Sequence, residues 1–113
     1  MSVSLGIHKG KAFDCYQSEF IDDIPVSFQS VWNGLWQDAI KACEIQIFKL
    51  GANFTVNQIP EVIAEIDKIF DWIQINEGKD KDYISVRINN QLKPFLMTFY
   101  QEHKDEDYWF DLG

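Results

Sequence analysis

Residues 59 to 73 read IPEVIAEIDKIFDWI, and this stretch decides the fold. Apolar side chains recur in it every three or four positions, which is the period of an amphipathic α-helix. Pro60 suits the first helical position, and Glu61 and Glu65 lie near the positive end of the helix dipole. Trp72 falls at the margin of the apolar stripe, where it either covers the core or joins a contact surface. The stripe, which predicts a helix that buries one face, consists of Ile59, Val62, Ile63, Ile66, Ile69, Phe70 and Ile73.

A second helical pattern begins at Ser27, upstream of this stretch. Ser27 is placed to cap its N-terminus, and Gly51 is placed to follow its C-terminus. Gly34 interrupts the pattern and costs about 1 kcal/mol of helix propensity, so we expect a bend or a close packing contact there. Residues 44–50 also alternate, and the alternative is a strand that turns into residues 54–56; we favour the helix. The apolar positions of this pattern are Phe28, Val31, Trp32, Leu35, Trp36, Ala39, Ile40, Cys43 and Ile47.

The amino-terminal segment predicts one strand and one long loop. Residues 2–8 alternate, with Val3, Leu5 and Ile7 on one side, which is typical of a strand. Residues 9–25 show no regular period, so we predict a loop there, with at most one helical turn.

The last third of the chain predicts an antiparallel meander. The predicted order is a polar turn at 76–82, a strand at 83–88, a turn at 89–91, a strand at 92–100, a polar turn at 101–107 and a strand at 108–112. Pro94 argues for an edge position or a strand start. Together these elements predict an α+β fold, in which two main helices pack on one face of a small antiparallel sheet.

Length and composition predict one small cytoplasmic domain. The chain has 113 residues, a common size for a single domain, and its hydrophobic fraction of 46% supplies enough apolar side chains for a core. Its two cysteines, Cys15 and Cys43, suggest neither a disulfide framework nor a zinc site. We find no secretory signal and no apolar stretch of the roughly 20 residues that span a membrane, so the expected location is the cytoplasm.

Charge is the most informative bulk property. The chain carries 18 acidic and 10 basic residues, for a formal net charge of -8. Residues 1–50 have four basic and six acidic side chains, whereas residues 51–113 have six and twelve, so the acidity is concentrated in the second half. Such a surface disfavours nucleic acid as a partner, because phosphate binding needs clustered lysine and arginine. It serves either solubility alone or the recognition of a basic partner.

The sequence contains no recognisable catalytic apparatus. It has no glycine-rich phosphate loop, no GxSxG elbow and no HExxH motif. His8 and His103 have no acidic or cysteine partner at metal-ligand spacing, and a lone Arg87 offers little to a phosphorylated substrate. We therefore expect a protein that is not an enzyme and that needs no cofactor or metal.

Near the carboxyl terminus acidic side chains directly flank large aromatic ones, which is a chemistry suited to binding. Carboxylates oppose the lysines and arginines of a basic partner, while tryptophan and tyrosine provide anchors. In the predicted last strand Trp109 faces opposite to Tyr108 and Phe110, so we expect Trp109 to be an exposed anchor. The alternative is a strand that closes the core after a charged turn. The candidate contact residues are Trp72, Asp80, Asp82, Glu102, Asp105, Glu106, Asp107, Trp109 and Asp111.

These acidic turns, with Trp109 nearby and no catalytic residues, resemble at the level of a class the small acidic immunity proteins of bacterial toxin systems. That class includes the immunity proteins of contact-dependent growth inhibition and of nuclease bacteriocins. The resemblance implies a cytoplasmic protein that binds a cognate toxin domain tightly and blocks its activity; if the toxin is a nuclease, its basic groove supplies the complementary charge. Two alternatives remain: another acidic binding module, such as a nucleic-acid-mimicking inhibitor or a regulatory adaptor, and a small enzyme.

Overall fold

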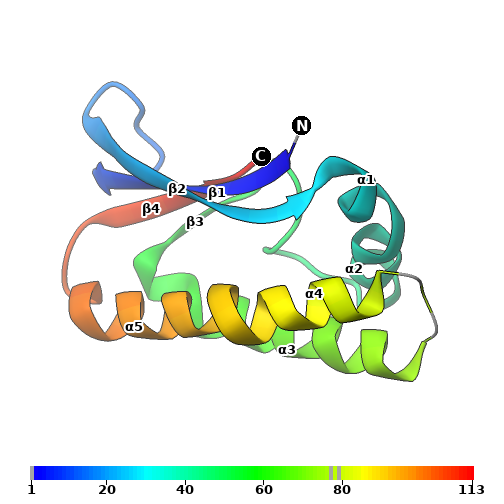
Figure 1. Cartoon of the computed structure of the whole chain (residues 1–113). Coiled ribbons are helices and arrows are strands. Elements are labelled where there is room, and N and C mark those ends of the chain that lie inside the picture. The colour runs from blue at the N-terminus through cyan, green and yellow to red at the C-terminus, as the bar shows by residue number, and fades with distance from the viewer. Residues whose placement is uncertain (1, 77, 79) are drawn as a thin grey trace.

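One antiparallel sheet and a layer of helices make up the protein (Figure 1). The computed structural model describes residues 2–76, 78 and 80–113, and across these residues four strands lie in the order β2-β1-β4-β3. The strands are β1 (Ser2–Gly10), β2 (Ser18–Phe28), β3 (Asn53–Thr55) and β4 (Tyr108–Leu112). The helices lie on one side of the sheet, so the predicted α+β class is confirmed.

In the β1–β2 hairpin, the sequence predicts the first strand but not the second. The strand predicted at residues 2–8 is β1, and its three apolar side chains are buried toward the helices. The loop predicted at 9–25 is confirmed only at residues 11–17, because β1 extends to Gly10 and β2 begins at Ser18 and pairs along β1. The pairing contains two register shifts, and β2 is exposed over most of its length. Both features break the two-residue alternation by which a strand is recognised in a sequence.

The helix predicted from residue 27 forms but is bent and short. Its parts are α1 (Gln29–Val31), a π-helical turn η1 (Trp32–Trp36) and α2 (Gln37–Ala42). The expected bend at Gly34 is confirmed, since this residue has φ −99° and ψ −106° inside the π-helical turn. Ser27 does not act as the N-cap: the capping position is Phe28, which makes no side-chain capping bond.

Residues 44–50 form neither the predicted end of this helix nor the alternative strand. The helix ends at Ala42, and Glu44 adopts a left-handed φ of 54° that no helix continues through. The carboxylate of Glu65 then accepts hydrogen bonds from three successive backbone N–H groups of the segment. They are Gln46 N at 2.9 Å, Ile47 N at 3.0 Å and Phe48 N at 2.8 Å. A tertiary contact therefore fixes this irregular segment.

The helix predicted from Pro60 is confirmed as α3 (Ile59–Ile75). Pro60 occupies its first turn, and a short 3₁₀ turn η2 (Val56–Gln58) leads into it. The backbone N–H of Thr55 donates to Gln58 Oε1 at 2.9 Å, which fixes the entry to the helix. One side of α3 is completely buried, through Ile59, Val62, Ile66, Ile69 and Ile73.

A long helical segment replaces the two strands predicted at 83–88 and 92–100. It consists of α4 (Lys81–Arg87), a π-helical turn η3 (Ile88–Leu92) and α5 (Lys93–His103). The predicted turn at 89–91 is therefore also wrong, and residues 77 and 79 of the turn predicted at 76–82 lie outside the described residues. The polar turn predicted at 101–107 is reduced to residues 104–107, because α5 continues to His103.

Four buried side chains explain why residues 81–103 form a helical segment and not two strands. Ile84, Ile88, Leu92 and Leu96 recur every four residues and are all buried. A strand over 83–88 would place Val86 on the same face as Ile84 and Ile88, but Val86 is 57% exposed. The π-helical turn ends two residues before Pro94, and a wider turn accommodates a residue that has no N–H and whose ring crowds a regular helix.

The strand predicted at 108–112 is confirmed as β4, although its neighbours are not those of a meander. β4 lies between β1 and β3, and Phe110 stacks on Phe54 of β3 with a centroid distance of 5.0 Å. Below the sheet, Trp32 and Trp36 stack at 5.0 Å and both pack near Phe48. No helix among the described residues combines the length and the apolar composition needed to cross a membrane.

Removing the Glu65 carboxylate should destabilise the protein. Glu65→Ala leaves three backbone N–H groups without their acceptor, and we expect it to lower the free energy of unfolding by about 2–3 kcal/mol. Asp71→Ala, on an exposed position of the same helix, is the control and should change it by less than about 0.5 kcal/mol. Urea unfolding followed by fluorescence measures both; equal losses would contradict the role assigned to Glu65.

Candidate interaction surface

Two groups of the residues predicted to make contact lie at opposite ends of one helical segment. Asp80 and Asp82 lie at the start of α4, whereas Glu102 lies at the end of α5 in the same helical segment (Figure 1). A rise of about 1.5 Å per residue separates Asp82 from Glu102 by about 30 Å. Trp72 does not serve as an exposed anchor for either group, because it is partly buried against the core. The predicted set is therefore not one site.

Trp109 is buried, so its predicted role as an exposed anchor is wrong. Only 3% of it is exposed, and its indole Nε1 donates to Ser18 Oγ at 2.9 Å. Trp109 does lie on the sheet face that points away from Phe110 and the core, as its alternation in β4 predicts. Its burial comes from the hairpin loop (residues 11–17), because Phe13 approaches the indole edge-on with a centroid distance of 5.8 Å.

Four rings lie in a line across this outer face of the sheet, and we call them the aromatic row: Phe20, His8, Trp109 and Phe13. His8 stacks on Trp109 at 4.0 Å with an interplanar angle of 10°, and Phe20 meets His8 edge-on at 5.5 Å. Phe13 has a left-handed φ of 63°, an unusual conformation for a bulky residue. The row thus joins three strands and the hairpin loop.

Asp111 is tied to this row by a histidine. His8 Nε2 lies 2.9 Å from Asp111 Oδ1, and about half of the Asp111 side chain is exposed. Gly6 makes room for the pair, since a Cβ atom at that position would lie 2.1 Å from the same oxygen. Asp111 is therefore held in place on the outer face, with one side of its carboxylate open to solvent.

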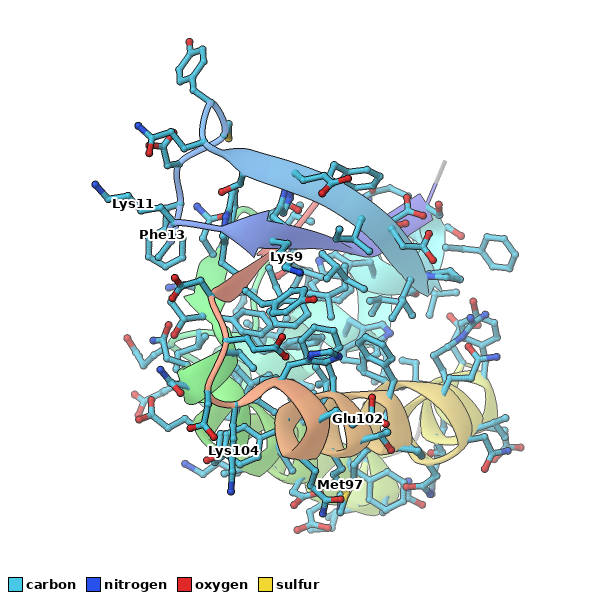
Figure 2. The ribbon with its side chains drawn as sticks, turned by 90° about the vertical axis from the view of Figure 1, so that its left-hand side faces the viewer. Lys9, Lys11, Phe13, Met97, Glu102 and Lys104 are labelled. Atoms are coloured by element: carbon cyan, nitrogen blue, oxygen red, sulfur yellow. The ribbon has the colours of Figure 1, made fainter. Side chains whose placement is uncertain are left out.

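The acidic turn (Asp105, Glu106 and Asp107) is exposed, as predicted from the sequence. The Glu106 carboxylate contacts His103 Nδ1, and the carbonyl oxygen of Asp107 accepts a hydrogen bond from Gly10 N at 2.9 Å. This last bond holds the acidic turn beside the base of the hairpin loop. Figure 2 views that end of the molecule, with Lys11 and Phe13 on the hairpin loop, Lys9 on β1, and Glu102 and Lys104 at the end of α5. The end therefore carries both signs of charge.

The sequence analysis missed an apolar surface on the hairpin. Of the nine large hydrophobic side chains that are exposed among the described residues, four lie within residues 13–21. They are Phe13, Tyr16, Phe20 and Ile21. The available signal was the apolar pair at 20–21 directly beside the acidic pair at 22–23, but the segment was predicted to be a loop.

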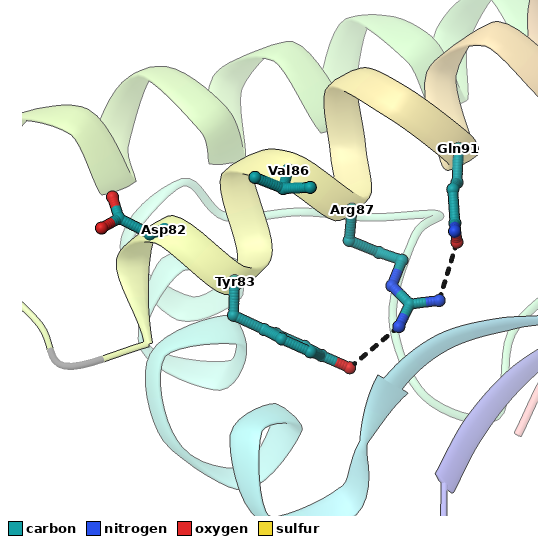
Figure 3. Close-up of a pocket in the computed structure, with 5 residues that line it drawn as sticks. All are labelled: Asp82, Tyr83, Val86, Arg87 and Gln91. Atoms are coloured by element: carbon teal, nitrogen blue, oxygen red, sulfur yellow. Dashed lines mark hydrogen bonds between the residues drawn. The ribbon is translucent and has the colours of Figure 1, made fainter.

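A shallow pocket of about 350 Å³ lies on α4 and η3, lined by Asp82, Tyr83, Val86, Arg87 and Gln91 (Figure 3). The guanidinium group of Arg87 donates to Gln91 Oε1 at 2.7 Å and to Tyr83 Oη at 3.2 Å. It also points toward the carbonyl oxygen of Pro25 in β2, at 3.4 Å. These contacts make Arg87 a link between α4 and the sheet.

A second shallow groove of similar volume runs between α3 and α5, with Met97 and Tyr100 in its lining. Within the described residues, no group of three or more His, Cys, Asp or Glu side chains is arranged to hold a metal ion. Comparisons with protein-family models, with curated proteins and with solved structures found no match to this chain.

The two cysteines should differ in reactivity. Burial raises the pKa of the Cys43 thiol, only partly opposed by the nearby Lys68, so less reactive thiolate is present at neutral pH. Cys15 is exposed on the hairpin loop. We expect iodoacetamide to alkylate Cys15 about tenfold faster than Cys43, as followed by mass spectrometry of the folded protein. Unfolding in urea should abolish the difference; equal rates in the folded protein would contradict it.

Proposed function

We propose that this protein binds and neutralises a basic partner protein in the cytoplasm, as an immunity protein neutralises its cognate toxin. The observation that supports the proposal is an acidic surface that the chain does not compensate itself. The formal net charge is -8, and among the described residues only Lys93 and Asp67 form an ion pair between a lysine or arginine and a carboxylate. Carboxylates such as those of Asp23, Asp105 and Asp107 are exposed to cations from outside.

The position of the carboxylates favours association with a partner. Asp105, Glu106 and Asp107 project from one short turn, where their fields add. Such a cluster attracts a positively charged protein before contact and speeds the encounter. A nuclease toxin would be a suitable partner, because a groove that binds phosphates is lined by lysine and arginine. Blocking that groove would exclude its substrate.

Capture of the partner tests this proposal. Tagged protein is incubated at low salt with a lysate of the organism that encodes it, and bound polypeptides are identified by mass spectrometry. We expect one basic polypeptide in near-equal amount, whose affinity falls steeply as salt is raised. The purified polypeptide should arrest growth when produced alone and not when produced together with this protein. A failure to recover any stoichiometric basic partner would refute the proposal.

Competition by DNA and growth rescue together separate the proposed inhibitor from the other acidic modules. A nucleic-acid mimic occupies the site on its partner that DNA uses, so added DNA displaces it. An adaptor leaves the partner's activity intact. Displacement by DNA together with restored growth identifies an inhibitor of a nuclease.

Neutralising the acidic turn should slow association. The triple variant Asp105→Asn, Glu106→Gln, Asp107→Asn removes three negative charges from one turn, and we expect a several-fold lower association rate at low salt. The matched control carries Asp38→Asn, Glu44→Gln and Asp71→Asn, which remove the same charge from exposed positions elsewhere. Stopped-flow or surface-based kinetics compare the two. Equal effects would show that only the net charge matters.

A further inference from the structure

We propose that the partner docks on the outer face of the sheet, at its hairpin end, and that Phe20 and Asp23 are its main contacts. This inference builds on the proposed function, because it names the surface that a basic partner uses. The helices cover the opposite face of the sheet, and among the residues that the structure describes only the hairpin loop lies over the outer face (Figure 1). A face without a covering layer is where a partner finds room.

Small residues lie on the outer face beside the aromatic row, namely Ser4 and Gly6 of β1. In the register of the hairpin, Asp23 lies opposite Gly6 and Phe20 lies opposite His8, so both side chains belong to this face. Phe20 is 59% exposed although it contacts the His8 ring. Part of an aromatic ring is thus presented to solvent on this face.

Two carboxylates lie on the same face of the sheet as this exposed ring. Asp23 lies on β2 and Asp111 on β4, with β1 between them, whereas Asp22 pairs with Ile7 and belongs to the opposite face of β2. Neither Asp22 nor Asp23 forms a salt bridge among the described residues. An aromatic face attracts a lysine or arginine head group, and adjacent carboxylates reinforce the attraction. The chemistry of the surface therefore selects a cationic segment.

Protection of the sheet edge explains only part of this surface. β2 is an edge strand, and edge strands resist pairing with other chains by means of charges, proline and bulges. β2 has all three, in its acidic pair, in Pro25 and in two register shifts. Docking by strand addition is therefore disfavoured. Exposed Phe20 and Ile21 do not serve that protection, since apolar side chains at an edge promote association.

The occupant is a segment of a basic protein rather than a second copy of this chain. A second copy would bring its own charge of -8 toward the same carboxylates, and like charges oppose association. A segment rich in lysine and arginine meets complementary charge and aromatic surface together. Lys9 of β1 does not offset these carboxylates, because its side chain lies on the other face of the sheet, over the Tyr108 ring at 5.9 Å.

A titration with defined peptides tests the docking surface directly. The full chain is titrated with a short peptide of alternating arginine and lysine while backbone amide NMR signals are followed; a peptide of alternating glutamate and lysine is the control. We expect the largest shifts at His8, Phe20, Asp23 and Asp111, and none with the control peptide. Shifts centred on the acidic turn or on α4 would overturn the inference, as would an absence of binding.

Matched variants separate a defined surface from diffuse attraction. Asp22→Asn with Asp23→Asn should weaken peptide binding several-fold, whereas Asp80→Asn with Asp82→Asn removes the same charge at the start of α4, outside the proposed surface, and should have little effect. Phe20→Ala should weaken it by up to about tenfold, as for a contact anchor. Phe20→Leu keeps apolar bulk and removes the aromatic face, so it should also weaken binding. Equal effects of the two double variants would overturn the inference.

The captured partner provides an independent test, in which failure of the docking surface can be told apart from failure of the proposed function. The alkylation of Cys15, on the hairpin loop, should slow when the basic polypeptide is bound. A basic partner that is recovered, inhibited and bound without protecting Cys15 or depending on Phe20 would overturn the docking surface and leave the proposed function standing. Recovery of no basic partner would instead refute the proposed function.

Discussion

Burial of one apolar stripe on α3 is the constraint on which the rest of the structure depends. The stripe lies between the sheet and the second long helical segment, and five of its side chains are completely buried, from Ile59 to Ile73. Each such side chain contributes roughly 1.5–3 kcal/mol when it is fully removed from water. The same helix carries Glu65, whose carboxylate fixes residues 46–48, so α3 also organises the one long irregular segment. Both the hydrophobic core and the irregular segment at residues 46–48 thus depend on α3.

Packing on one side of the sheet has a consequence on the other. Because the helices cover one face, Trp109 on the outer face needs another cover, and the hairpin loop supplies it through Phe13. The loop reaches this position at the cost of a left-handed backbone at Phe13. The aromatic row follows from this arrangement, and it places the exposed Phe20 beside carboxylates. The hairpin loop that buries Trp109 thereby also contributes to a surface with the chemistry of a binding site.

Part of the candidate surface was accessible from the sequence. The acidic turn at 105–107 is exposed as predicted, because three consecutive carboxylates in a polar turn have no reason to be buried. The burial of Trp109 could not be predicted from the sequence, since its exposure depends on where residues 11–17 lie. The separation of Asp82 from Glu102 was also hidden, because two predicted strands would have brought them closer than one helical segment does. Phe20 was missed with the strand that carries it.

The sequence by itself determined the elements whose period is long or whose alternation is clear: α3, β1, β4, the bend at Gly34 and the α+β class. It also determined the net charge, which no fold can change. Tertiary structure decided the segments whose pattern satisfies two periods. Ile84 and Ile88 fit both a strand and a helix, and the choice depends on whether Leu92 and Leu96 can be buried on the same side. For β2 the decision came from pairing with β1, because an exposed strand with register shifts gains its stability from its neighbour and not from its own pattern.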